Sequence, residues 1–280
     1  RLHAIVWRDE HHRRDVFRKL RLRRRPCRKP RACGRGDDDD FLANGAANSH
    51  CLGIIIDPRI DARHRHGGAV LPMAGQARIV EVRAQCRTGK AERITLRNVP
   101  AFADRLQVPL EVGGLGTVMV DTAFGGDSFV MADGKALGFA ITPDEAADIA
   151  KVGRKLVAAA NAQLGFSHPT LPEWKHYSFA FVTGPLETVD GALSSRNACV
   201  INPGKIDRSP TGTGVSALMA VLHAKGKMKA GETFIGRSII ESRFIGRIVE
   251  ETVLGGRSAI VPEISGRAWI TGTATLMLDF

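Results

Sequence analysis

The sequence predicts an α+β fold of two lobes, each formed by a β-sheet wrapped around a central helix. Strand and helical patterns alternate from residue 78 onward, in the order strands, helix, strands, helix, strands. The second helical pattern, residues 213–225, is apolar on every side. Such a helix is enclosed by other elements and does not lie on a surface, which favours a sheet that surrounds it.

Short strands account for most of the patterned sequence. Residues 79–84 and 92–97 alternate apolar and polar side chains on either side of Gly89, as the two strands of a hairpin do. Further short strands are predicted at residues 110–112, 117–121, 129–131, 233–235, 238–240, 244–249 and 259–261.

The first helical pattern opens on Thr142-Pro143-Asp144-Glu145. This run has a hydroxyl residue as N-cap, proline at the first helical position and a glutamate that can complete a capping box. Apolar residues follow at helical spacing until Gly165, which predicts the C-terminal end. The second helix is predicted to stop in the same way at Gly226.

The positive charge of the chain is confined to its N-terminal segment. The formal net charge is +11, and residues 1–36 hold twelve Arg and two Lys against three acidic residues, which leaves the remainder near neutral. Residues 1–43 show no regular period, so three interpretations stay open: a basic arm for nucleic acid or a membrane surface, a disordered or targeting extension, or translation in a wrong reading frame. The patternless runs of Arg, His, Cys and Pro favour the third. Nucleic acid is therefore not an expected partner.

Composition also limits the cellular setting. No stretch approaches the roughly 18 uninterrupted apolar residues of a membrane span, and the N-terminus has no secretory pattern, so a cytoplasmic protein is expected. The five cysteines are odd in number and form no CxxC pair or zinc-ligand spacing. Neither a disulfide framework nor a metal site is predicted.

The chemistry is expected to centre on residues 207–214, Asp-Arg-Ser-Pro-Thr-Gly-Thr-Gly, immediately before the buried helix. Gly212 and Gly214 allow the backbone to approach a ligand closely, and the free amides of the first helical turn can bind a carboxylate. The Asp207 carboxylate can supply a negative partner for the ammonium group of a substrate. Together these groups would hold an α-amino acid at both of its charged ends.

Two other interpretations of this segment stay open. It can be an ordinary loop-to-helix turn with Thr213 as the N-cap. Residues 212–217 also fit the dinucleotide pattern G-x-G-x-x-A, but that turn follows directly after a hydrophobic strand, whereas residues 207–210 intervene here. The dinucleotide interpretation is therefore disfavoured.

Residues 207–214 resemble the second active-site signature of the proline racemase family, DRSPCGTG or DRSPTGTG. The similarity extends from about residue 78 to residue 273, and the chain is identified as a member of the family. Other segments agree with the family in the same order along the chain, at residues 121–130, 164–169, 202–205 and 264–272.

The resemblance implies two pseudo-symmetric lobes with the active site between them, no cofactor, no metal, a small-molecule substrate (hydroxyproline or proline) and a homodimer. The first lobe is expected to comprise residues 44–120 with residues 258–280, and the second lobe residues 121–257. Residues 1–43 lie outside the family pattern.

Thr211 indicates which reaction of the family is expected. Racemases and epimerases of the family use two cysteines, one on each face of the substrate α-carbon, and a thiol pKa near about 8.5 lets each accept and donate a proton. Thr211 occupies the second of these positions, and its hydroxyl is too weak an acid for that role. Members with Thr here resemble trans-3-hydroxy-L-proline dehydratases, in which one base takes the α-proton and the β-hydroxyl leaves as water to give pyrroline-2-carboxylate.

The same resemblance implies the substrate contacts. Thr211 would position the departing hydroxyl and Asp207 would hold the ring nitrogen. The carboxylate would be bound by the amides of Gly212 and Thr213. His176 matches a substrate-contacting histidine of the family. His168, by contrast, is expected to be structural.

The first active-site loop departs from the family pattern. Residues 48–51, Asn-Ser-His-Cys, match the end of that loop, but Gly45 stands where the family supplies its base, and glycine has no side chain to accept a proton. Little or no activity is therefore expected. The alternatives are a 4-hydroxyproline 2-epimerase or proline racemase, which Thr211 disfavours, a non-catalytic amino-acid-binding protein, and a nucleic-acid-binding protein.

Overall fold

The computed structural model describes residues 66–73, 76–87 and 90–267. Its helices are the 3-10 turn η1 (Pro143–Glu145), α2 (Ala146–Gln163) and α3 (Gly212–Ala224). Its strands are β1 (His66–Met73), β2 (Gln76–Arg87), β3 (Lys90–Arg97), β4 (Phe102–Val112), β5 (Gly116–Phe124), β6 (Ser128–Asp133), β7 (Phe179–Thr183), β8 (Glu187–Val189), β9 (Ala192–Ile201), β10 (Lys205–Ile206), β11 (Thr233–Arg237), β12 (Arg243–Leu254) and β13 (Arg257–Gly266). The predicted α+β class is confirmed. Within these described ranges, neither helix is long and apolar enough to cross a membrane.

The strands form one continuous hydrogen-bonded path that closes on itself. Its order is β1-β2-β3-β13-β12-β11-β9-β7-β6-β5-β4, with β8 and β10 paired to β9. The first part of β9 pairs in parallel with β11, and its last residues pair antiparallel with β7, so β9 joins the two halves of the path. Just before β4, Ala101 exchanges both backbone hydrogen bonds with Ile260 of β13, each at 2.8 Å. The strands from β13 to β4 therefore form a ring.

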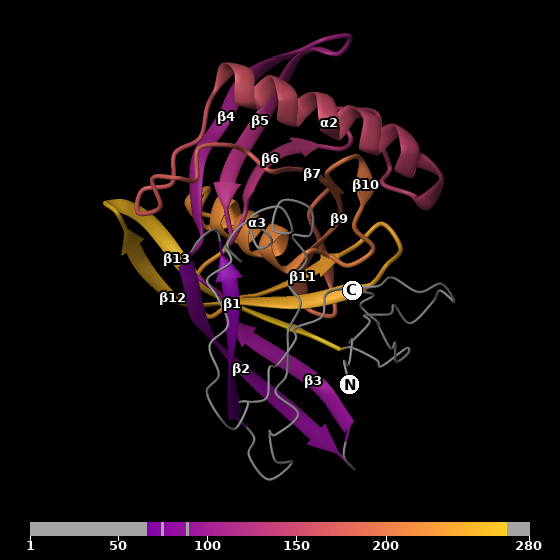
Figure 1. The fold of residues 1–280 in the computed structure, drawn as a ribbon. Coiled ribbons are helices and arrows are strands. Elements are labelled where there is room, and N and C mark those ends of the chain that lie inside the picture. Colours follow the sequence, from indigo (N-terminus) through magenta and orange to yellow (C-terminus); the bar gives the residue numbers. More distant parts are fainter. Residues whose placement is uncertain (1–65, 74–75, 88–89, 268–280) are drawn as a thin grey trace, which may run out of the picture.

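Helix α3 lies inside this ring of strands (Figure 1). Residues 214–222 are all buried. Val215 and residues 217–222 belong to one hydrophobic cluster with Phe129, Phe181 and Phe234, which come from β6, β7 and β11. The apolar pattern on every side of this helix follows from that position, because residues 214–222 are enclosed on all faces. The prediction of a sheet wrapped around a central helix is confirmed for α3.

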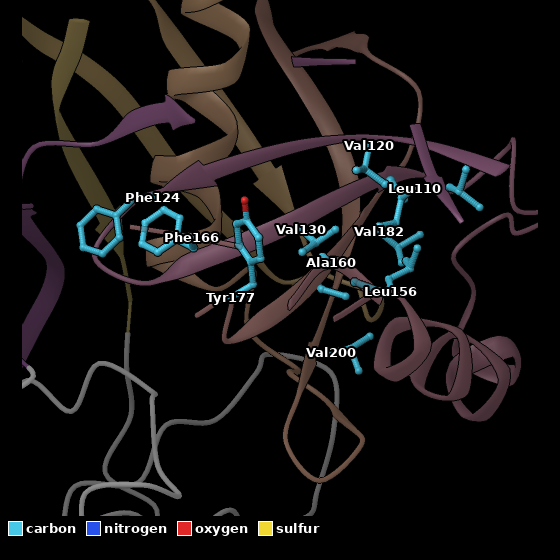
Figure 2. Close-up of a cluster of buried hydrophobic side chains, with 14 of the residues drawn as sticks. Leu110, Val120, Phe124, Val130, Leu156, Ala160, Phe166, Tyr177, Val182 and Val200 are labelled. Atoms are coloured by element: carbon cyan, nitrogen blue, oxygen red, sulfur yellow. The ribbon is translucent and has the colours of Figure 1, made fainter. Parts of the chain in front are cut away.

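Helix α2 covers β4 to β7 from outside the ring (Figure 1). Leu156 and Ala160 pack there against valines of the strands, including Val130 and Val182, in a second hydrophobic cluster (Figure 2). The predicted capping box is present, although the first turn is the 3-10 turn η1 and the α-helix starts only at Ala146. The helix ends one residue before Leu164, and Gly165 follows at φ 63°.

The predicted hairpin of residues 79–84 and 92–97 is confirmed as β2 and β3. The strand predicted at residues 238–240 is wrong, because these residues form the turn between β11 and β12. The Ser238 hydroxyl accepts hydrogen bonds from the backbone N–H groups of Ile240 at 3.3 Å and Ser242 at 3.2 Å. Such local bonds from serine give the backbone an alternative to a strand ladder.

The ring around α3 draws on both predicted lobes. The expected boundary after residue 120 falls within β5, and β4 and β13 come from the range assigned to the first lobe. The division into two lobes stays a prediction. Residues 1–65 and 268–280, which include the basic segment and the expected base position at Gly45, lie outside the described residues.

Candidate active site

Residues 207–211 form a tight loop that brings Asp207 and Thr211 into contact just before α3. Ser209 donates two hydrogen bonds to the half-buried Asp207 carboxylate, from its backbone N–H at 3.0 Å and from its hydroxyl at 3.1 Å. The Thr211 hydroxyl donates to Oδ2 of the same carboxylate at 2.8 Å. These bonds fix the orientation of the Asp207 side chain.

Thr211 has a strained backbone conformation, with φ 62° and ψ 96°. A β-branched residue at positive φ carries strain of about 1–3 kcal/mol, which persists only where the surrounding structure imposes it. Thr211 is also the N-cap residue of α3, yet its hydroxyl bonds to Asp207 and makes no cap hydrogen bond. The first amides of α3 lack acceptors within the helix, and with the helix dipole they can bind an anion.

Two glycines let other elements approach the first turn of α3. A Cβ on Gly214 would lie 2.5 Å from the ring of Phe181 in β7. A Cβ on Gly125 would lie 2.2 Å from the backbone oxygen of Thr213. The Gly125 carbonyl also accepts a hydrogen bond from the buried side chain of Asn98 at 2.9 Å. The loop between β5 and β6 therefore rests directly on the start of α3.

Asp127 ends that loop, with its side chain buried against the site. Only 2% of the residue is exposed. Its Oδ1 accepts the backbone N–H of Ser128 at 2.8 Å, and its carboxyl group also has a hydrogen bond with the Ser178 side chain. Burial raises the pKa of Asp127 from 3.8 to about 7, although these hydrogen bonds and the charge of His176 oppose the shift. Near neutral pH the group is therefore divided between its charged and neutral forms.

His176 is exposed but held in place from two directions. Its ring stacks on the buried Trp174, with ring centroids 6.2 Å apart and an interplanar angle of 13°. Its backbone carbonyl accepts a hydrogen bond from the Ser128 hydroxyl at 2.7 Å. That hydroxyl in turn accepts from Nε1 of Trp174 at 3.0 Å. The ring and the backbone of His176 are therefore both held by neighbouring residues.

Cys199 in β9 interacts electrostatically with both acidic residues of the site, Asp207 and Asp127. The thiol is buried, and it has a hydrogen bond with the Thr211 side chain. Burial raises the pKa of the Cys199 thiol well above its ordinary value, and the negative charges of Asp207 and Asp127 act in the same direction. The thiol is therefore neutral near pH 7.

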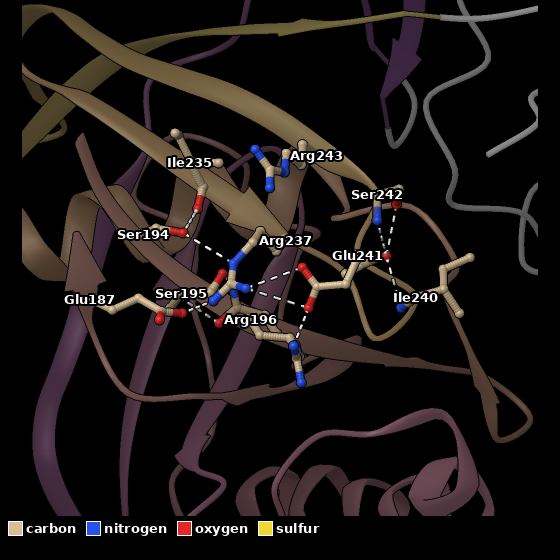
Figure 3. Close-up of polar contacts among 12 residues, drawn as sticks. Glu187, Ser194, Ser195, Arg196, Ile235, Arg237, Ile240, Glu241, Ser242 and Arg243 are labelled. Carbon is tan, nitrogen blue, oxygen red and sulfur yellow. Dashed lines mark hydrogen bonds and ion pairs between the residues drawn. The ribbon is translucent and has the colours of Figure 1, made fainter. Parts of the chain in front are cut away.

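A network of ion pairs adjoins the turn that contacts the loop of residues 207–211. Arg237 of β11 pairs with Glu187 and Glu241, and Arg196 also pairs with Glu241 (Figure 3). Glu241 belongs to the turn between β11 and β12, whose Ser242 hydroxyl donates to the backbone carbonyl of Arg208 at 2.7 Å. The turn that replaced the predicted strand thereby contacts the loop of residues 207–211.

The structure gathers four of the predicted site residues, Asp207, Thr211, Gly212 and Thr213, at the start of α3. His176 lies in the loop before β7, where it interacts electrostatically with Asp127. His168 is buried and its ring lies edge-on to Phe124 at 4.5 Å, in agreement with the structural role expected for it.

Sequence analysis missed Asp127 and Cys199 as site residues. The signal for Asp127 was available, since an acidic residue stands between the Gly125-Gly126 pair and an apolar strand. A buried cysteine in a strand carried no such signal, because an ordinary core position has the same pattern. The expected base position at Gly45 lies outside the described residues.

One cavity of the described residues lies apart from this site. A cavity of about 290 Å³ lies at the other end of α3, between Ala220, His223, Asp104 and Arg257. Among residues 66–73, 76–87 and 90–267, no three His, Cys, Asp or Glu side chains are grouped as metal ligands.

The sheet closes around α3, and Thr213 stands between Gly212 and Gly214 at the start of that helix. This architecture is that of the racemase-like α+β proteins. The family model described as proline racemase matches residues 54–280. The chain belongs to the proline racemase family, which is a family of enzymes.

Two solved structures show how far the similarity extends. A probable proline racemase from Agrobacterium radiobacter K84, with bound carbonate, is 30% identical with a TM-score of 0.71, and the match covers 79% of this chain and 63% of that one. A hydroxyproline epimerase from Agrobacterium vitis, with bound trans-4-hydroxy-L-proline, is 33% identical with a TM-score of 0.69, covering 76% and 60%. The chain therefore spans about three fifths of the length of these relatives.

Proposed function

We propose that the site binds a hydroxyproline and carries out cofactor-independent dehydration of trans-3-hydroxy-L-proline to pyrroline-2-carboxylate. The observation that carries this proposal is the position of Thr211. Its hydroxyl stands at the start of α3, bonded to Asp207 at 2.8 Å, at the position where racemases of the family have a thiol. An aliphatic hydroxyl cannot take up and return an α-proton near neutral pH, but it can hold another hydroxyl group in place.

Substrate binding would use both charged groups of the amino acid. The amides of Gly212 and Thr213 would receive the carboxylate, where the helix dipole favours negative charge. Asp207 would accept the ring N–H₂⁺ group, because Ser209 and Thr211 already fix the direction of its carboxylate. The two contacts would orient the ring with its hydroxyl group toward Thr211.

A second candidate, epimerisation at the α-carbon of 4-hydroxyproline, is favoured by one observation. The hydroxyproline epimerase from Agrobacterium vitis is 33% identical to this chain. Against it stands the chemistry of Thr211, since epimerisation needs a proton donor and acceptor on each face of the α-carbon.

The test is an NMR assay of the full chain with trans-3-hydroxy-L-proline and, separately, with trans-4-hydroxy-L-proline. We expect slow loss of the 3-hydroxy compound, because Gly45 replaces the expected base, and no epimer of the 4-hydroxy compound. Epimerisation of the 4-hydroxy compound would overturn the proposal. Turnover of neither compound, with both still binding, would indicate an amino-acid-binding protein.

A Thr211→Cys variant separates the two reactions further. It restores a thiol at the position that racemases of the family use. We expect the variant to lose dehydration and to gain formation of D-proline from L-proline, measured by chiral chromatography. A variant that still dehydrates at the wild-type rate would show that Thr211 does not hold the departing hydroxyl.

A further inference from the structure

Two arginines lie side by side on neighbouring strands close to the active-site loop. β9 and β11 run parallel, and their register places Arg196 directly beside Arg237. Both side chains are partly buried, with exposed fractions of 33% and 11%. Like charges on adjacent strands repel each other, and the repulsion is stronger away from water. The pair is therefore stable only with a carboxylate that reaches both guanidinium groups.

Glu241 supplies this carboxylate. Its side chain pairs with Arg196 and also with Arg237, in the second case at 3.1 Å (Figure 3). The backbone of Glu241 has φ 64°, a left-handed conformation that a residue with a side chain keeps only where its surroundings impose it. The two arginines thus hold the end of the β11–β12 turn in a strained but defined position.

Ser242 follows Glu241 directly and contacts the active-site loop. The N–H of the buried Ser238 donates to the Ser242 carbonyl at 2.9 Å, which closes the turn. The Ser242 hydroxyl gives its proton to the backbone carbonyl of Arg208 at 2.7 Å. It therefore accepts from the Ser238 hydroxyl, which lies 2.7 Å away. The two hydroxyl groups form a chain of hydrogen bonds that ends on the loop of residues 207–211.

The contacted carbonyl belongs to the peptide group that also orients Asp207. The C=O of Arg208 and the N–H of Ser209 are parts of one planar unit. Its oxygen accepts from Ser242, and its N–H donates to Oδ1 of Asp207 at 3.0 Å. A hydrogen bond to the carbonyl polarises the amide and strengthens its N–H as a donor. Ser242 therefore fixes the peptide plane on the side opposite to the Asp207 carboxylate.

We propose that Ser242 and Glu241 are positioning residues for the ammonium group of the substrate, an inference that rests on the proposed role of Asp207. Ser242 orients the peptide group between Arg208 and Ser209, and this group orients the Asp207 carboxylate. Glu241, held by the two arginines, keeps Ser242 in place. The first amides of α3 lie outside this chain of contacts, so the carboxylate end of the substrate is bound independently of it.

The test compares two ligands by titration calorimetry of the full chain. L-proline carries a ring N–H₂⁺ group, whereas cyclopentanecarboxylate has a ring of the same size and the carboxylate but no nitrogen. We expect Ser242→Ala to weaken L-proline binding about 5-fold and to leave cyclopentanecarboxylate binding unchanged. Ser242→Thr, which keeps the hydroxyl, should restore the affinity. An equal loss for both ligands would overturn the inference, because general damage to the site lowers both.

Amide hydrogen exchange tests the same contact without a ligand. The Ser209 N–H, bonded to Asp207, should exchange about 10-fold faster in Ser242→Ala than in the wild type. The Val215 N–H, bonded to the Thr211 carbonyl at 2.8 Å, is the internal reference and should keep its rate. Unchanged exchange at Ser209 would overturn the inference. Thr183→Val is the matched control, because its hydroxyl also donates to a backbone carbonyl, that of Ala132.

Glu241→Gln tests whether the ion pairs act through Ser242. The variant keeps the shape of the side chain but leaves the adjacent arginines without their shared charge, and we expect about 3-fold weaker L-proline binding. Combined with Ser242→Ala, it should bind L-proline no more weakly than Ser242→Ala alone. Losses that multiply would show that Glu241 acts by another route. Glu250→Gln, which removes an exposed pair with Arg97 on the same strand β12, should bind as the wild type does.

The outcomes separate this inference from the proposed function. The expected binding pattern without dehydration of trans-3-hydroxy-L-proline would remove the proposed reaction and leave the positioning role standing. Dehydration with unchanged L-proline affinity in Ser242→Ala would remove the positioning role alone. A wild type that does not bind L-proline, or an Asp207→Asn variant that binds it as tightly, would overturn the inference, because no ammonium contact would then exist to be positioned.

Discussion

The two ends of α3 are built in opposite ways. At the C-terminal end the backbone carbonyls of Leu222 and His223 accept hydrogen bonds at 2.8 and 2.9 Å from the residues that follow the helix, and Gly226 adopts φ 67°. This is a relaxed Schellman cap with glycine in the left-handed position. At the N-terminal end the left-handed position is occupied by Thr211, and the cap hydrogen bond is missing.

The acidic side chains near the two ends, Asp104 and Asp127, also differ in their partners. Asp104, near the C-terminal end, is 6% exposed in its side chain, and it pairs with Arg257 at 2.7 Å and accepts from Tyr177 at 2.9 Å. Asp127, near the N-terminal end, is buried with hydroxyl and amide partners and has a pKa of about 7. Among the described residues, backbone strain at a helix end and a strongly perturbed acid therefore coincide at the N-terminal end of α3. The cavity of about 290 Å³ lies at the relaxed end, away from the candidate site.

The largest expected effect is that of adding a methyl group at the strained end. In Gly125→Ala the Cβ would meet backbone atoms of α3 at 2.2 and 2.4 Å, which no side-chain rotation can relieve. We expect a loss of about 3 kcal/mol in the free energy of unfolding, measured in urea. Gly226→Ala is the control, since its Cβ meets nothing within 4 Å and only its positive φ opposes alanine, at about 1 kcal/mol. Equal losses in the two variants would contradict the comparison.

The second effect concerns pH and Asp127. The folded-state pKa of about 7 lies above the ordinary value of 3.8, so the folded protein binds this proton more tightly than the unfolded chain. The contribution of this group to stability is therefore full below pH about 4 and is lost as pH rises toward 7. Asp127→Asn keeps the shape of the neutral acid and removes this loss. The difference in free energy of unfolding, variant minus wild type, should therefore be about 2–3 kcal/mol larger at pH 8 than at pH 5.

A pH-independent difference between Asp127→Asn and the wild type would show that Asp127 ionises as an ordinary surface acid. Urea unfolding at pH 5 and at pH 8 is sufficient for this measurement. A stabilised variant that turns over substrate more slowly would indicate that the acid is kept for function at the expense of stability.

The smallest effect is expected from the hydroxyl of Thr211. Thr211→Val removes the hydrogen bond to Asp207 but keeps the β-branched shape and the backbone strain, and we expect a loss of about 1 kcal/mol. Thr117→Val is the matched control, because its hydroxyl also donates to a carboxylate, that of Glu111, but on an exposed hairpin. Its loss should be below about 0.5 kcal/mol. Calorimetric unfolding compares the two, and a Thr211→Val loss no greater than that of the control would show that the bond contributes nothing to the loop.

Local patterns predicted much of the fold. The capping box at Thr142, the stop at Gly165 and the all-round apolar helix before Gly226 depend on neighbouring residues, so the sequence alone placed both helices. The strands β7 and β9 were not predicted, although β9 joins the two halves of the sheet. Their residues are buried on both sides, so they lack the alternation that marks a half-buried strand.

By itself the sequence determined the segment of residues 207–214, its family and the substitution of threonine for a thiol, because these depend on residue identity in one continuous run. Only the tertiary structure decided which distant groups meet that run. Asp127 comes from the loop before β6, and closure of the sheet around α3 brings that loop onto its first turn. The pKa of Asp127 likewise depends on burial and on partners from other elements, so no local pattern could have given it.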